Sequence, residues 1–224
     1  MGSEAGTEKT TELRFDSRSV REILESVGGP GTLVVVDGYH SRLVPAGIPR
    51  VVVTDNTRDA IRSVREEREF DRVIGIGTCS ALDFAKAVAT ERAPVTLLPI
   101  VLSTACISID KSVIRENGRS TAVLTVAPDR TIVPIREIMG APADLRRRTG
   151  ASGFGDILAR FGAAADVADR RGTSLAEVLR EMPDTTSVLE WILSEFSGFD
   201  EACMRALARF SHSASLVTIS NRES

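Results

Sequence analysis

The sequence has few of the residues that build metal centres, disulfides and aromatic binding surfaces. Its 224 residues include three cysteines, two histidines, one tryptophan and one tyrosine. Cys79, Cys106 and Cys203 lie far apart and form neither a metal-ligand nor a redox spacing. An odd, sparse set of cysteines indicates reduced thiols and a cytoplasmic protein. With only His40 and His212, the chain cannot build a three-histidine site by itself.

Long apolar runs and an excess of positive charge are also missing. No apolar stretch reaches the about 18 residues of a membrane span. The first residues, MGSEAGTEKTTE, lack the apolar segment of a signal peptide. The net charge of −3 provides no broad basic surface for nucleic acid or anionic lipid. We therefore expect a cytoplasmic protein that binds small molecules rather than nucleic acid or membranes.

Strand-like and helical patterns alternate in the first part of the chain. The helical patterns are Ser17–Val27, Asp59–Arg68 and about Ser80–Thr90, and the β-branched runs are Thr32–Asp37, Arg50–Thr54, Arg72–Ile76 and Val95–Pro99. This alternation predicts βαβ units and a mostly parallel, Rossmann-like sheet with helices on both faces. Shorter strand-like runs follow at Ser112–Arg115, Ala122–Val126 and Thr131–Ile135, which predicts a sheet of five or six strands between Thr32 and Ile135.

Strand signals end near Met139–Pro142, where helical periodicity takes over. Helices are expected through Gly150–Arg171, Ser174–Arg180, Ser187–Phe196 and Glu201–Ser215. We therefore predict an α/β protein in three parts: a flexible N-terminus at 1–14, a nucleotide-binding α/β domain at 15–140 and a partial all-α domain at 141–224.

The most informative segment is VIGIGTCSALDFAK, residues 73–86. A buried strand ends at Gly75-Ile76-Gly77 and a helix begins near Ser80. Glycines allow close backbone approach, and the amides at a helix N-terminus bind anions such as a pyrophosphate. A tight connection without a ligand is the other interpretation, with Ser80 as the N-cap and Asp83 in a box-like arrangement.

This segment resembles the G-G-G-S-x-x-D-x-A-K stretch of the iron-containing alcohol dehydrogenase superfamily. That superfamily also holds 3-dehydroquinate synthase and glycerol-1-phosphate dehydrogenase. Collinear matches run from about Phe15 to Ala168 and include LLPIVLSTACIS, the GFGD of the metal motif and AAADVA. The last of these is similar to the A-x-x-D-W helix of the glycerol-1-phosphate dehydrogenases, which makes that branch the closest. The resemblance implies a dehydroquinate synthase-like fold in which a Rossmann-like domain is followed by an incomplete all-α domain.

The resemblance also implies an activity. It is an NAD(P)-dependent, metal-assisted oxidation or reduction of a glycerol-phosphate-like or polyol substrate. Lys86 is the expected catalytic residue, anchoring the phosphate-loop helix or a nearby phosphate, and Asp156 is the expected metal ligand. The carboxylate of Asp37, at a strand end, suits ribose hydroxyls. The expected cofactor-binding residues are Asp37, Gly75, Gly77, Thr78, Cys79, Ser80, Asp83, Ser103 and Thr104.

Several residues depart from the family pattern. Thr78 and Cys79 stand where the family has glycines, so a side chain there crowds the pyrophosphate or changes the backbone. Arg160 occupies the place of a histidine ligand in the iron-type enzymes. Asp156 has a second interpretation as a helix N-terminal acid. One carboxylate cannot hold Zn²⁺ or Fe²⁺. His212 could substitute for a missing ligand, but it falls where the family tends to place a small residue.

The family's later histidines have no counterpart, so we expect a C-terminally truncated homologue that is impaired when alone. Two alternatives stay open beside the dehydrogenase. One is a non-catalytic nucleotide-binding or partner subunit. The other is a sugar-phosphate cyclase, although that branch typically lacks the Asp83/Lys86 pair. A partial helical domain exposes an apolar face, so a homo-oligomer or a complementing subunit is expected.

Overall fold

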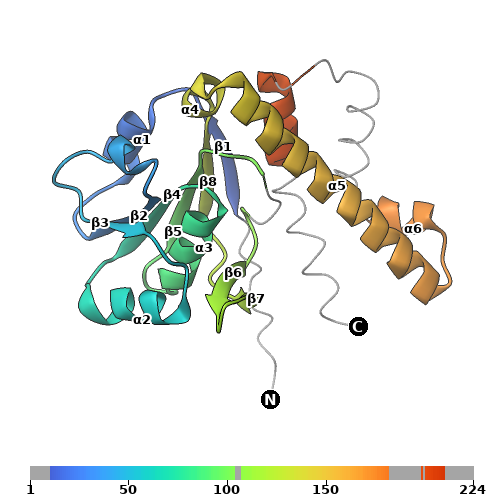
Figure 1. The fold of residues 1–224 in the computed structure, drawn as a ribbon, viewed down its shortest axis with the longest axis horizontal. Coiled ribbons are helices and arrows are strands. Elements are labelled where there is room, and N and C mark those ends of the chain that lie inside the picture. The colour runs from blue at the N-terminus through green and yellow to red at the C-terminus, as the bar shows by residue number, and fades with distance from the viewer. Residues whose placement is uncertain (1–10, 104–106, 182–197, 199, 210–224) are drawn as a thin grey trace.

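A parallel β-sheet forms the centre of the computed structural model, which describes residues 11–103, 107–181, 198 and 200–209 (Figure 1). Its six strands lie in the order β1-β8-β5-β4-β2-β3. They are β1 (Glu12–Asp16), β2 (Thr32–Asp37), β3 (Arg50–Val53), β4 (Arg72–Gly77), β5 (Val95–Pro99) and β8 (Arg130–Pro134). All neighbouring strands are parallel, as the alternation of strands and helices predicts.

Helices cover both faces of this sheet because its central strands are apolar on both sides. Val34 and Val36 of β2 pack with α1 (Val20–Val27) on one face. Leu33 and Val35 pack with α2 (Arg58–Glu67) and α3 (Cys79–Val88) on the other. The helix at 201–209 joins this second face through a buried set of side chains: Cys203, Met204, Leu207 and Ala208.

Short-range signals explain where the covering helices begin and how closely they pack. Ser19 and Glu22 form a capping box at the start of α1, in which each side chain accepts the other's backbone N–H. α3 lies close against β4 because Gly75 has no side chain. A Cβ at Gly75 would lie 2.6 Å from the Cβ of Ala85. The Gly75 position therefore serves helix–strand packing.

Two parts of the sheet prediction are wrong. The sheet begins at β1, within the segment expected to be flexible through residue 14, because Glu12–Asp16 pairs with β8. The runs expected at Ser112–Arg115 and Ala122–Val126 do not join the sheet. They form a separate antiparallel hairpin of β6 (Lys111–Glu116) and β7 (Arg119–Leu124). Asn117 and Gly118 close it with φ of 51° and 75°, the backbone of a tight hairpin turn.

Helices follow the sheet, as predicted. They are α4 (Ile135–Gly140), α5 (Ala143–Arg171) and α6 (Leu175–Arg180), and the residues described beyond Ala143 contain no strand. α5 begins seven residues before the expected Gly150, directly after Pro142. Gly172, with φ of 62°, ends it in a left-handed cap. The helix expected at Ser187–Phe196 lies outside the described residues, as does the end of the Glu201–Ser215 helix.

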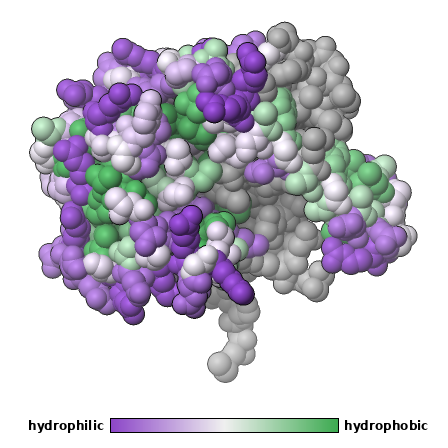
Figure 2. Space-filling model, in the orientation of Figure 1, coloured by the Kyte–Doolittle hydropathy of each residue, from purple (hydrophilic) through white to green (hydrophobic). Residues whose placement is uncertain are grey.

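The visible face of the molecule is largely hydrophilic, with small separate apolar patches (Figure 2). Within the described part of the chain, no helix combines the length and apolarity needed to cross a membrane.

Candidate nucleotide-binding site

The sheet topology places a crevice between the carboxyl ends of β2 and β4, which are neighbours in the sheet. The connection after β2 leads outward to the edge strand β3, whereas the connection after β4 leads through α3 in the opposite direction to β5. Such a switch point leaves room above the strand ends and is where ligands bind in open α/β sheets. Asp37 ends β2 and Gly77 ends β4, so both lie at this point.

The turn that leaves β4 depends on Gly77. Its φ of 124° is one that residues with side chains rarely adopt. A Cβ at Gly77 would also overlap the Asp37 carboxylate. Thr78 and Cys79 have no such requirement, since Thr78 is extended (φ −88°, ψ 174°) and Cys79 begins α3. Thr78 and Cys79 therefore fit ordinary backbone conformations, so they do not change the backbone of the turn. Their side chains can still crowd the pyrophosphate.

Asp37 holds this turn together. Its carboxylate accepts hydrogen bonds from the backbone N–H of Thr78 and of His40, both at 2.9 Å, and lies 2.8 Å from Nδ1 of His40. Partial burial raises the pKa of the Asp37 carboxyl, but the hydrogen bonds from His40 and Thr78 outweigh it. The pKa therefore lies below its ordinary value of 3.8. The carboxylate expected to bind ribose thus already serves the turn, and its direct contact with ribose stays a prediction.

The start of α3 is not capped by the side chain of its own N-cap residue. Its N-cap is Thr78 rather than Ser80, and the Thr78 side chain makes no capping hydrogen bond. Ser80 lies exposed in the first turn. Amides at an uncapped helix start carry partial positive charge and are suited to a phosphate.

The loop after β5 and helix α5 meet the start of α3. The Sγ of Cys79 lies 3.4 Å from Oγ of Ser103. Ser152 of α5 donates a hydrogen bond of 3.3 Å to the carbonyl of Ser103. A Cβ at Gly153 would lie 3.0 Å from the Leu102 carbonyl, so α5 approaches the loop closely. Cys79 and Ser103 are therefore in contact at the start of α3, and their contact with a cofactor stays a prediction. Thr104 lies outside the described residues.

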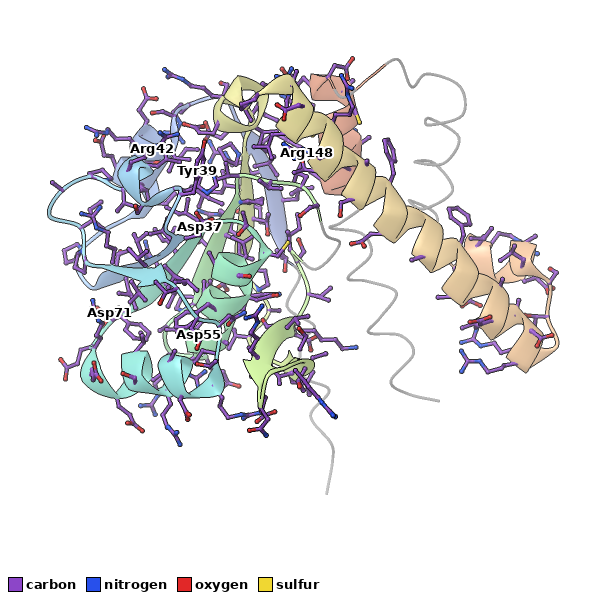
Figure 3. All side chains as sticks on the ribbon, viewed as in Figure 1. Asp37, Tyr39, Arg42, Asp55, Asp71 and Arg148 are labelled. Atoms are coloured by element: carbon purple, nitrogen blue, oxygen red, sulfur yellow. The ribbon has the colours of Figure 1, made fainter. Side chains whose placement is uncertain are left out.

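A pocket of about 280 Å³ lies next to the turn, on the α1 side of the strand ends. The loop after β2 contributes Tyr39, His40 and Arg42. Other lining residues follow β5 and β8: Ile100, Val101, Arg136, Glu137, Gly140, Ala141, Pro142 and Leu145. Figure 3 shows Asp37, Tyr39 and Arg42 following one another outward from β2. The pocket has room for one ring system and lies beside the anion-suited start of α3.

Lys86 and Asp83 lie apart from the turn and have a different role. Lys86 is fully buried, and its Nζ lies 3.1 Å from Oδ1 of Asp83 and donates to the Lys111 carbonyl. Oδ2 of Asp83 accepts the N–H of Val113 at 3.1 Å. The pair thus attaches hairpin strand β6 to α3. Of the two roles predicted for Lys86, the geometry matches anchoring of the helix, and Asp83 does not form the box-like cap with Ser80.

Asp156 lies on α5, one helical turn after Ser152. Within the described ranges, no group of three or more His, Cys, Asp or Glu side chains could hold a metal ion. His212 lies outside those ranges. The described residues therefore do not fit a catalytic zinc or iron site, which needs at least about three protein ligands.

His40, Tyr39 and Arg42 are site residues that the motif comparison did not predict. One local signal was available, because Asp-Gly after a buried strand indicates a turn in which the aspartate accepts a nearby backbone N–H. That signal places His40 beside Asp37. The sequence holds no corresponding signal that Arg136, far along the chain, lines the same pocket.

Comparisons with known proteins agree with this architecture. No protein-family model matches the sequence. The glycerol-1-phosphate dehydrogenase [NAD(P)+] of Archaeoglobus fulgidus is 28% identical over 99 residues, 44% of this chain and 27% of that protein. The chain therefore matches only about a quarter of that relative's length.

Solved structures extend the likeness over nearly the whole chain. A probable glycerol dehydrogenase from Sinorhizobium meliloti has a TM-score of 0.66 and 19% identity, covering 91% of this chain and 64% of its own. The glycerol dehydrogenase of Schizosaccharomyces pombe has a TM-score of 0.69 and 17% identity, covering 93% and 60%. An iron-containing alcohol dehydrogenase from Thermotoga maritima has a TM-score of 0.59 and 17% identity, covering 94% and 67%. The predicted resemblance is confirmed for the fold: this chain has the Rossmann-like sheet and following helices of these proteins.

Proposed function

We propose that this chain binds NAD or NADP at the β2–β4 switch point and acts as an oxidoreductase on a glycerol-phosphate-like or polyol substrate. The observation that carries the proposal is the Gly77 turn. It combines a backbone conformation that favours glycine, an uncapped helix start and a crevice at the strand ends. The glycerol-1-phosphate dehydrogenase match adds support for the substrate class.

The described residues of the site would contact different parts of the dinucleotide. The start of α3 binds the pyrophosphate through backbone amides, and Asp37 fixes the turn that presents them. The neighbouring pocket receives the adenosine end of the dinucleotide. Ser103 and Cys79 border the pyrophosphate on the side of α5. A bound nicotinamide supplies hydride transfer, and the protein positions it against the substrate.

The described residues do not form a metal site. Dinucleotide binding and turnover are therefore tested separately. Binding of the dinucleotide depends on residues that the structure describes, whereas polarisation of a substrate carbonyl is not assigned to any of them.

Calorimetric titration with NADH and NADPH tests binding. The matched variants are Gly77→Ala and Gly162→Ala, because a Cβ at Gly162 meets open space within α5. Gly77→Ala is expected to weaken dinucleotide binding by at least about tenfold, and Gly162→Ala to leave it unchanged. Circular dichroism checks that both variants fold. Saturable binding that Gly77→Ala does not weaken would refute the assignment of the turn.

Turnover is then measured with glycerol phosphates, dihydroxyacetone phosphate and simple polyols, each with zinc, iron or nickel. Turnover that requires the intact Gly77 turn supports the oxidoreductase. Dinucleotide binding without turnover supports a nucleotide-binding subunit instead.

A further inference from the structure

Two arginines from different elements line the pocket beside the Gly77 turn. Arg42 belongs to the loop after β2, and Arg136 belongs to α4, which follows β8. Glu137 is the one carboxylate among the pocket's lining residues. Two guanidinium groups against one carboxylate give the pocket a positive charge even with His40 neutral.

Both arginines are placed to accept an anion. The Arg42 guanidinium lies 5.1 Å from the centroid of the Tyr39 ring, and no described carboxylate pairs with it. The contact with the ring holds the guanidinium at the pocket rim. Arg136 lies 3.8 Å from Oε2 of Glu22, which already accepts the Ser19 backbone N–H of the α1 capping box. Because the Arg136–Glu22 pair is long and exposed, replacing it with an interaction with a ligand costs little free energy.

Backbone N–H groups bind the carboxylates of Glu137 and Asp37. Oε1 of Glu137 accepts the Val20 backbone N–H at 2.8 Å, whereas its buried Oε2 has no hydrogen-bond partner among the described residues. The Asp37 carboxylate is held by Thr78 and His40, and only 16% of its side chain is exposed. An acidic residue at this strand end favours the free ribose 2′-hydroxyl of NAD, whereas a nearby arginine accommodates the 2′-phosphate of NADP. Here the acid is occupied in the turn and the arginines are available.

We propose that this site prefers NADP(H) to NAD(H), and that Arg42 and Arg136 bind the 2′-phosphate of the adenosine ribose. The inference rests on the proposed dinucleotide site and adds its specificity. A 2′-phosphate carries nearly two negative charges at neutral pH, and charge-assisted bonds to guanidinium groups are the strong ones.

The test compares two probes that differ in one group: adenosine 2′,5′-bisphosphate and 5′-AMP. Dissociation constants are measured by calorimetry on the full chain, and on Arg42→Gln, Arg136→Gln and the double variant. Arg62→Gln is the matched control, because Arg62 is an exposed arginine of α2 outside this pocket. In the unsubstituted chain, adenosine 2′,5′-bisphosphate is expected to bind at least about tenfold more tightly than 5′-AMP. This difference corresponds to one charge-assisted hydrogen bond.

The ratio of the two dissociation constants is the readout. It should fall toward one in the double variant, fall partly in each single variant and stay unchanged in Arg62→Gln. The advantage of the bisphosphate should also shrink at high salt. Equal affinity for both probes in the unsubstituted chain, or a ratio that the double variant leaves intact, overturns the specificity alone. Failure to bind either probe, NADH or NADPH overturns the proposed site and the specificity together.

Discussion

The central sheet and helix α5 are held in the protein by different means. In the sheet, side chains such as Val34, Ile74 and Leu97 are completely buried, and helices cover both faces. In α5, the buried positions among the described side chains are small residues only: Gly150, Gly153, Ala164 and Ala168. The sheet therefore draws its stability from apolar area removed from water. α5 relies more on close backbone approach and on the local preference for helix, together with the half-buried rings of Phe154 and Phe161 that pack against the core.

This difference predicts that changes in the sheet region alter global stability, whereas matched changes in the helical region act locally.

The largest expected effect lies at the buried pair that attaches the hairpin to α3. Lys86→Met leaves the Asp83 carboxylate without its cation and should lower the free energy of unfolding by about 3–5 kcal/mol in urea titrations. The exposed pair of Arg62 and Asp59 is the control, since Arg62→Met should cost less than about 0.5 kcal/mol. Replacing both members, as Asp83→Leu with Lys86→Met, should recover part of the loss. A fully stable Lys86→Met would contradict a structural role for this lysine.

A smaller effect, which depends on pH, is expected at Asp37. At neutral pH, Asp37→Asn weakens the bonds from Thr78 and His40 and should cost about 1–3 kcal/mol. Because the folded pKa is lowered, the ionised carboxylate stabilises the protein above its unfolded pKa, near 3.8, and this contribution is lost as pH falls through the lower folded value. The stabilities of the two proteins should therefore begin to approach each other as the pH falls below about 3.8 and should coincide only below the folded pKa. Asp55→Asn, at an exposed carboxylate, should match the unsubstituted chain (Figure 3).

Two equivalent capping boxes give a direct comparison of the regions. Ser19 and Glu22 cap α1, whose residues Val20, Ile23 and Leu24 are buried, and Ser174 and Glu177 cap α6 in the same way. Ser19→Ala should lower the global free energy of unfolding by about 1 kcal/mol. Ser174→Ala should leave it unchanged and speed amide hydrogen exchange in α6 alone. Equal global losses for both variants would show that the helical region unfolds together with the sheet.

The smallest expected effects differ between two glycines of α5. A Cβ at Gly155 meets open space, so Gly155→Ala should stabilise by about 0.5–1 kcal/mol. A Cβ at Gly153 would press on the Leu102 carbonyl and on Leu207, 3.0 and 3.2 Å away, which offsets that gain. Thermal unfolding should therefore rank Gly155→Ala above Gly153→Ala. A higher stability for Gly153→Ala than for Gly155→Ala would contradict the close approach of α5 to Leu102 at Gly153.

The sequence pattern predicted the central strands well because they are apolar on both faces. It did not predict β1, since ELRFD is mostly polar and its strand pairs on one side only, with β8 far along the chain. It assigned β6 and β7 to the sheet because strand propensity does not specify the partner. Gly150, which suggested a helix start, lies buried inside α5, which begins at Ala143.

In the site too, the sequence predicted local features but not contacts between distant elements. The glycine turn could be predicted because close backbone approach requires glycine at a fixed place in the motif. The contacts of Asp37 with Thr78 and of Lys86 with Lys111 could not be predicted, because each joins residues from different elements.

The buried Lys86 also makes the chain suitable for chemical labelling. Lysines occur at only three positions in the sequence, Lys9, Lys86 and Lys111, beside 25 arginines. An amine-selective reagent therefore has few targets, and the Lys86 amine becomes reactive only when the hairpin separates from α3. The rate at which mass spectrometry detects modification at Lys86, compared with the half-buried Lys111, would measure the opening of that one contact in the native protein.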